Sequence, residues 1–153
     1  MLTIHAADEV RYVWDESEPE PEPVKDGAVA VEGVRIAAVG PLAELVERFP
    51  GGRVRRWPGV LGPARVHEGP LPDAPTPRER IHAVLKLGAV AVLEEHAGAP
   101  GLRAAAERND VVVLARSRPT ALVDLGRADL AVLDDGGACI ATVCAGRLVH
   151  RRR

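Results

Sequence analysis

Aromatic residues are scarce in this sequence of 153 residues. The four Phe, Trp and Tyr residues are Tyr12, Trp14, Phe49 and Trp57. The hydrophobic fraction is nevertheless 46%, so the core has to be built from Val, Leu, Ile and Ala. A chain of this length can bury such a core in one domain or in a compact pair of small lobes.

A large excess of charge of one sign is also missing. The formal net charge is −2, whereas proteins that bind nucleic acid or anionic membranes usually carry a strong basic excess. We therefore expect neither a nucleic-acid partner nor a membrane partner. The opening residues, MLTIHAADEV, lack the basic start and apolar run of a signal peptide, and no apolar run approaches the roughly 20 residues that cross a bilayer. A cytoplasmic location is the resulting expectation.

Cysteine and serine are rare as well, which limits the chemistry open to the chain. Cys139 and Cys144 fall in one apparent strand, ACIATVCAG, and their spacing places the side chains on opposite faces of that strand. We therefore expect two reduced thiols. The only serines are Ser17 and Ser117, and they suggest no Ser-His-Asp arrangement. No glycine-rich loop has the spacing and lysine of a phosphate site, and no cofactor is predicted.

Strand patterns dominate both ends of the chain. The run AVAVEGVRIAAVG predicts a hairpin around Glu32-Gly33, because glycine accepts the positive φ of a tight turn. The segment PLAELVERFPGG then predicts a helix with four apolar residues on one face, namely Leu42, Leu45, Val46 and Phe49. Other strands are expected within residues 2–14, 53–57, 128–134 and 139–150, with a solvated acidic loop at 14–27 and a long connection at 58–77.

The middle of the chain has a different pattern. Thr76 to Glu79 form a capping box with proline at the first helical position, and the helix behind it buries its apolar side chains. A strand at 89–93, a helix at 100–109 and a strand at 111–115 follow, which predicts a parallel pair with a right-handed crossover. The fold class expected is α+β, with β-rich ends enclosing a short α/β insert.

Two segments resemble the metal-dependent amidohydrolases, in the branch of imidazolonepropionase and aminodeoxyfutalosine deaminase. They are DGAVAVEGVRIAAVGP at 26–41 and GRADLAVLDDGGACIATVCAGRLVH at 126–150. The resemblance implies that residues 1–57 and 126–153 form the family's composite β-sandwich domain. In the family this domain flanks a TIM barrel of about 250 residues. Only residues 58–125 lie between the two ends here, so we expect a truncated α/β insert in place of the barrel.

The resemblance also says where metal ligands would stand. Family members follow a Pro-Gly with two histidines, one residue apart, at the end of the first barrel strand. If Pro58-Gly59 is that pair, the ligand positions fall on Ala64 and Val66; if Pro63-Ala64 is, they fall on Gly69 and Leu71. Neither alignment offers a metal ligand. The expectation is a degenerate site without metal.

A new site remains conceivable where LEEHAGAPG leads from a parallel strand into a helix, since ligands of α/β folds usually bind there. The speculative catalytic residues are Glu95 and His96, joined by His67 and Glu68 if the two pairs fold together. The simpler interpretation is a polar loop that ends a strand. The other histidines, His5, His82 and His150, are expected to be structural or exposed.

Three functions stay open at this point. The first is a stand-alone, non-catalytic composite domain that works by binding or assembly, with an unidentified protein or small-molecule ligand. A truncated barrel exposes apolar strands, which must be covered by the sandwich or by a second copy, so a homodimer is expected. The second is a metal-dependent hydrolase acting on non-peptide C–N bonds. The third is an accessory subunit of a separate barrel-bearing amidohydrolase.

Overall fold

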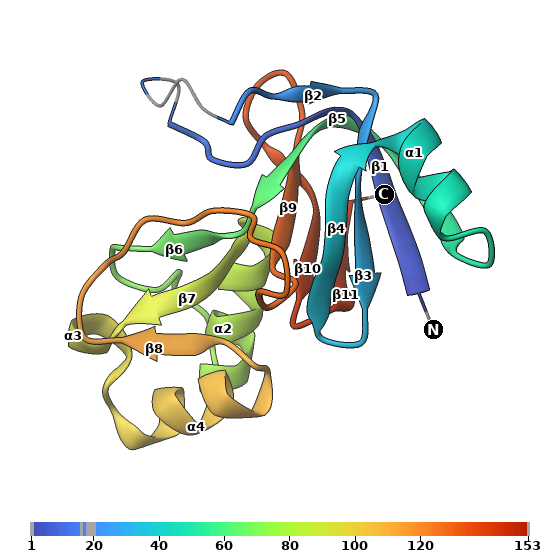
Figure 1. The fold of residues 1–153 in the computed structure, drawn as a ribbon. Coiled ribbons are helices and arrows are strands. Elements are labelled where there is room, and N and C mark those ends of the chain that lie inside the picture. Colours follow the sequence, from blue (N-terminus) through green and yellow to red (C-terminus); the bar gives the residue numbers. More distant parts are fainter. Residues whose placement is uncertain (1, 16, 18–20, 153) are drawn as a thin grey trace.

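The chain folds around one large mixed sheet. A computed structural model describes residues 2–15, 17 and 21–152 (Figure 1). The sheet has eight strands in the order β11-β10-β9-β5-β1-β3-β4, with β2 paired to β1 at the side. Their bounds are β1 Leu2–Val10, β2 Val24–Lys25, β3 Gly27–Glu32, β4 Arg35–Pro41, β5 Arg53–Pro63, β9 Leu130–Leu133, β10 Cys139–Cys144 and β11 Arg147–Arg151. The expected acidic loop at 14–27 lies partly outside the described residues.

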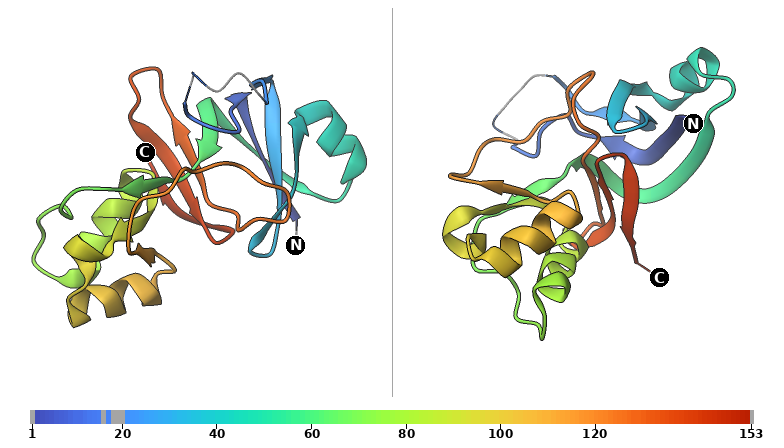
Figure 2. Two further views of the ribbon diagram at one scale, coloured as in Figure 1. Left: turned by 60° about the vertical axis from the view of Figure 1, so that its left-hand side comes forward. Right: turned by 90° about the horizontal axis from the view of Figure 1, so that it is seen from below.

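This sheet bends over so that its two halves face each other. Figure 2 shows the red strands β9 to β11 opposite the blue strands β1 and β3. Val29 and Ile36 from one half share a buried cluster with Leu130 and Val143 from the other. The edge of β4 is closed by a segment that precedes β9, because the Ile36 amide donates to the Gly126 carbonyl at 2.8 Å. The expected α+β fold with a composite sandwich is confirmed.

One outer face of the sandwich is covered by the helix α1, Leu42–Arg48. Leu45 packs there against Ile4 and a layer of alanines. Val46, expected on the same buried face, is instead 42% exposed. The helix is only seven residues long, and Val46 borders the open strip beside β5 that the helix does not cover.

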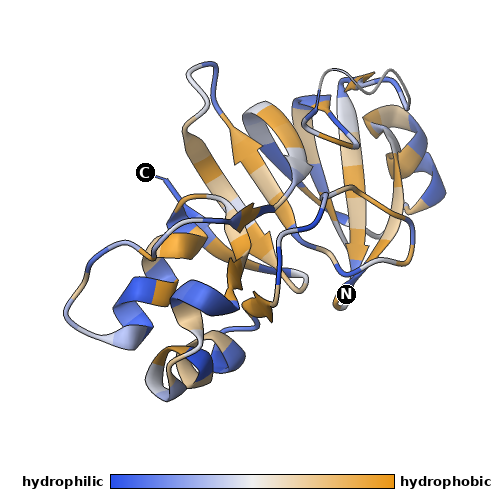
Figure 3. Cartoon of the chain, turned by 90° about the vertical axis from the view of Figure 1, so that its left-hand side faces the viewer, coloured by the Kyte–Doolittle hydropathy of each residue, from blue (hydrophilic) through white to orange (hydrophobic). Residues whose placement is uncertain are grey.

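A second, smaller sheet has three parallel strands in the order β6-β7-β8. Its elements are β6 Arg65–His67, α2 Pro77–Lys86, β7 Ala89–Leu93, α3 Glu94–Ala97, α4 Pro100–Arg108 and β8 Val112–Leu114. The predicted parallel pair is therefore present, and the Thr76 hydroxyl caps α2 by accepting from the Glu79 amide. The strands are mostly orange in Figure 3, whereas the exposed helix turns are blue.

The segment expected to be a connection, 58–77, contains strand structure that the sequence interpretation missed. β5 continues through Pro58 to Pro63, and β6 follows almost at once. Proline is tolerated here because the β1–β5 register shifts between Ala7 and Glu9, and an irregularity of this kind leaves one residue outside the ladder. The small sheet is thus attached directly to the end of β5.

The small sheet unit packs against the outer face of the sandwich. The Thr142 hydroxyl on β10 donates to the Leu85 carbonyl at the end of α2, at 2.7 Å. Cys144 and Val149 belong to the same apolar cluster as Val84 and Ile81 of α2. The sequence predicted that the apolar surface of this unit is covered by the sandwich or by a second copy of the chain. The sandwich covers part of it within a single chain.

The cysteine prediction is partly wrong. A register shift between Cys139 and Ala141 places Ile140 and Ala141 together in the inner core. Cys139 therefore lies on the same side as Thr142, with its Sγ 3.3 Å from the Thr142 Oγ1, and not opposite Cys144. Both cysteines are free. Burial raises the pKa of Cys144 to about 11, so its thiol stays protonated at neutral pH.

The turn between β10 and β11 generates a stability prediction. Gly146 has φ +81°, and a Cβ there would overlap the carbonyl oxygen of Gly33. Gly137 has φ +83° with no atom near the added Cβ. Gly137→Ala should lower the free energy of unfolding by about 1 kcal/mol through backbone strain alone, and Gly146→Ala by well over about 2 kcal/mol because strain and overlap add.

Urea denaturation of both variants measures the difference. Equal losses of unfolding free energy in the two variants would show that the β10–β11 turn does not contact the β3–β4 hairpin closely enough to exclude a Cβ at position 146.

Candidate functional site

His67 and Glu68 stand at the carboxyl end of β6, in the segment that the sequence predicted to be a connection. The His67 Nε2 donates to the Pro70 carbonyl oxygen at 2.9 Å. The Glu68 carboxylate accepts a hydrogen bond from the Ser117 hydroxyl, which comes from the segment after β8. Each of the two side chains thus already has a hydrogen-bond partner within the chain.

Glu95 and His96 lie in the short helix α3, directly after β7. The His96 Nε2 is 3.5 Å from the Glu95 Oε1, and Glu94 pairs with Arg103 of α4 at 2.8 Å. Within the described residues, no hydrogen bond or ion pair joins this group to His67 or Glu68. The structure therefore presents two separate polar pairs along one edge of the small sheet.

The positions where the family has metal ligands face another part of the chain. Ala64 and Val66 line a cavity of about 310 Å³ whose opposite wall is the segment Arg118–Ala121. Figure 1 shows the orange segment after β8 running past β6 before it returns to β9. At the alternative positions, Gly69 has no side chain and Leu71 is buried in the apolar cluster of α2.

The charges around this cavity do not fit a metal ion. Arg65, Arg118 and Arg127 line it, and the single acidic residue, Asp129, is already paired with Arg127 at 2.8 Å. Methyl and isopropyl groups at 64 and 66 donate no electron pair, and guanidinium groups repel a divalent cation. Across residues 2–15, 17 and 21–152, no group of three His, Cys, Asp or Glu side chains is arranged to hold a metal.

A buried pair that the sequence did not single out joins β1 to β5. His5 is 3% exposed, and its Nδ1 accepts a hydrogen bond from the Trp57 Nε1 at 3.2 Å. Burial, aided by the charge of Arg55, lowers the pKa of His5 to about 4. The neutral ring is thus the form that the fold requires. Alternation along β1, with Ile4 outward and His5 inward, was the sequence signal for it.

Comparisons with known proteins agree with this architecture. Residues 27–51 match the family described as the imidazolonepropionase-like composite domain of bacteria. The resemblance to the amidohydrolase composite domain is confirmed. No curated protein matches the sequence.

Three solved structures show the extent of the similarity. Guanine deaminase of E. coli superposes with TM-score 0.55 at 16% identity over 74% of this chain and 35% of its own. Guanine deaminase of Bradyrhizobium japonicum superposes with TM-score 0.53 at 12% identity, over 74% of this chain and 34% of its own. Triazine hydrolase of Arthrobacter aurescens superposes with TM-score 0.51 at 15% identity, over 73% of this chain and 34% of its own. The chain thus spans about a third of their length. At these identities, the likeness shows the fold alone.

No helix in the described part of the chain is long and apolar enough to cross a membrane.

The buried histidine predicts a pH dependence of stability. The unfolded chain binds a proton at His5 below its ordinary pKa of 6.5, whereas the folded chain binds it only near pH 4. Stability contributed by neutral His5 is therefore lost as the pH falls from 6.5 to 4, by about 3 kcal/mol in all. His5→Asn keeps an acceptor near the Nδ1 position and does not titrate. Urea denaturation from pH 8 to 4 should show a flatter profile for the variant.

Identical pH profiles for wild type and His5→Asn would mean that His5 titrates normally. His82→Asn is the comparison variant. His82 is exposed on α2 and its charge helps to lower the pKa of His150, so its replacement should change the slope between pH 6.5 and 4 much less than His5→Asn does.

Proposed function

We propose that this chain is a non-catalytic composite-domain protein that acts through binding or assembly. The observation that carries the proposal is the arginine-lined wall opposite Ala64 and Val66. A metal-dependent hydrolase needs imidazole, carboxylate or thiolate ligands and an open coordination position for water. In this chain the corresponding place holds apolar side chains under the chain's own segment Arg118–Ala121.

The alternative of a hydrolase has less support from the contacts. The three similar structures reported above are two deaminases and a hydrolase, but this chain spans only about a third of their length. His67 and Glu68 are engaged locally with Pro70 and Ser117. The Ser117 hydroxyl does meet the Glu68 carboxylate, but among the described residues no histidine hydrogen-bonds to Ser117, so the nucleophile–imidazole pair of a serine hydrolase is missing.

Assembly through a second copy is part of the proposal. Three exposed apolar side chains lie where the β3–β4 hairpin meets the segment before β9, residues 123–128. They are Val34, Val123 and Leu125, which are 51%, 57% and 76% exposed. They are held together because the Leu125 amide donates to the Ile36 carbonyl and the Ala128 amide to the Val34 carbonyl. Apolar side chains exposed together favour association.

Leu125 offers a test of assembly that does not rest on unfolding. It has φ +67°, a region that disfavours leucine and is tolerated by asparagine. Leu125→Asn should therefore leave the fold at least as stable while weakening the dimer, so that sedimentation at micromolar concentration shows more monomer. Leu87→Asn, at another exposed leucine far from β4, should keep the wild-type distribution. A monomeric wild type would contradict the homodimer.

Metal content tests the absence of catalysis. Protein purified without chelators should hold less than about a tenth of a zinc or iron per chain, since the described residues offer no ligand set. Addition of zinc should leave the melting temperature unchanged. Stoichiometric zinc, or a melting temperature that rises with zinc, would contradict the proposal.

A further inference from the structure

Another cavity lies away from the small sheet, on the outer face of the sandwich. It has a volume of about 720 Å³ and opens between α1 and β5. Its floor is Ala6 and Ala7 of β1, and its apolar wall is formed by Leu42 and Val46 of α1. Cavities of this size are typical of small-molecule sites. Nothing in the composite-domain similarity assigns it a ligand.

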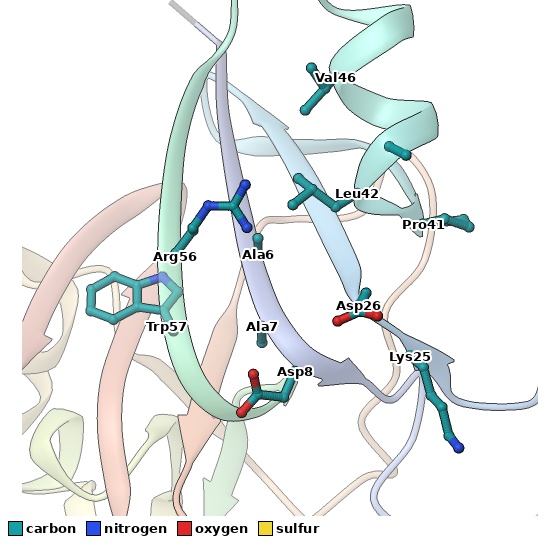
Figure 4. Close-up of a pocket in the computed structure, with 11 residues that line it drawn as sticks. Ala6, Ala7, Asp8, Lys25, Asp26, Pro41, Leu42, Val46, Arg56 and Trp57 are labelled. Atoms are coloured by element: carbon teal, nitrogen blue, oxygen red, sulfur yellow. The ribbon is translucent and has the colours of Figure 1, made fainter.

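Charged side chains of opposite sign stand at the two ends of this floor. Figure 4 shows the Arg56 guanidinium reaching over Ala6, the Asp8 carboxylate beyond Ala7 and the Asp26 carboxylate to the side of Ala7, while Lys25 points away. Among the described residues, the side chains of Arg56 and Asp26 form no hydrogen bond or ion pair. The cavity therefore has one positive and one negative end, neither neutralised by the other.

The backbone fixes the negative end. The β1–β5 register shift lies at Asp8 and Pro58-Gly59, and the Asp8 Oδ2 accepts from the Gly59 amide at 3.0 Å. The Asp26 amide donates to the Asp8 carbonyl at 2.9 Å, and its own carbonyl accepts from the Leu42 amide at 2.9 Å. The Asp8 carboxylate is thus held by a hydrogen bond of its own. The main chain at Asp26 is hydrogen-bonded both to β1 at Asp8 and to the start of α1 at Leu42.

The charged residues stand at separate positions along the cavity floor. Arg56 pairs with Ala6 across the two strands, and Asp8 is two residues further along β1, which is a main-chain rise of about 7 Å. A matching ligand therefore carries its two charges at separate ends, as an extended dipeptide does, whereas a free amino acid has both charges on one carbon.

The geometry points to a binding site for a zwitterionic dipeptide with an apolar side chain. Its carboxylate is bound by Arg56, its ammonium group by Asp8 and Asp26, and its side chain by Leu42 and Val46. Arginine suits the first role because its planar fork donates two parallel hydrogen bonds to a carboxylate. This inference deepens the proposed binding function and rests on it.

Titration of ¹⁵N-labelled protein with alanyl-leucine tests the site. Saturable shifts are expected for the amides of Ala6 to Asp8 and of α1, with none in β7. N-acetylation of the ligand removes its positive charge, and C-terminal amidation removes its negative charge. Each should weaken binding about tenfold. Free leucine should also bind more weakly than the dipeptide.

Variants separate charge recognition from general electrostatics. Arg56→Gln should weaken binding of alanyl-leucine about tenfold and make binding insensitive to amidation. Asp26→Asn tolerates the φ of +48° at this position and should reduce the loss caused by N-acetylation. Arg53→Gln is the matched control, since Arg53 is exposed on the same strand but does not line the cavity.

Several results would overturn the dipeptide site. They are the absence of saturable shifts, equal binding of the blocked ligands, equal binding of free leucine, and a loss in Arg53→Gln as large as in Arg56→Gln. The proposed function is judged separately. A chain that binds no dipeptide and no zinc still fits a non-catalytic role, whereas a zinc-loaded, active chain contradicts that role whatever the dipeptide does.

Discussion

The pairing of β5 on both of its edges is the constraint on which the rest of the fold depends. Its first nine residues run parallel to β1, and its last four run antiparallel to β9. These partners come from opposite ends of the sequence, so β5 joins the two halves of the sandwich. The join requires Gly59, because φ there is +94° and a Cβ would overlap the carbonyl oxygen of Leu133. Pro58-Gly59 thus serves the geometry of the strand.

Everything else in the insert follows from the end of β5. Only Ala64 separates β5 from β6, so the small sheet starts at a fixed place beside the sandwich. The hydrogen bond from Thr142 to Leu85 then docks α2 on β10. What remains is the other face of the small sheet, and the segment Arg118–Ala121 passes over it. The apolar residues Ala64 and Val66 thus lie beside the chain's own covering segment.

Local patterns predicted the elements that depend on short-range rules. The Thr76 cap, the parallel strands around α4 and the hairpin at Gly33 follow from capping, periodicity and turn chemistry. The continuation of β5 through Pro58 was missed because proline argues against a strand unless a partner strand tolerates the irregularity. The side of Cys139 depended likewise on a register shift in β10, which the sequence does not show.

The candidate site was harder to predict for the same reason. Sequence placed Glu95 and His96 at the end of a parallel strand, and that placement is present. It placed His67 and Glu68 in a connection, whereas the structure puts them at the end of β6. Whether such side chains meet depends on side-chain partners such as Pro70 and Ser117, which compete for them. The cavity between α1 and β5 depends on charges from three separate stretches of chain and on apolar side chains from a fourth. No local pattern in the sequence connects them.

A crystal structure of the protein grown with excess zinc would test the central claim most directly. The claim is that the chain's own segment Arg118–Ala121 closes the cavity that Ala64 and Val66 line at β6. The expected result is this segment in place over β6, with no zinc bound between it and the sheet. A zinc ion held by His67 and His96, with the segment displaced, would contradict the account.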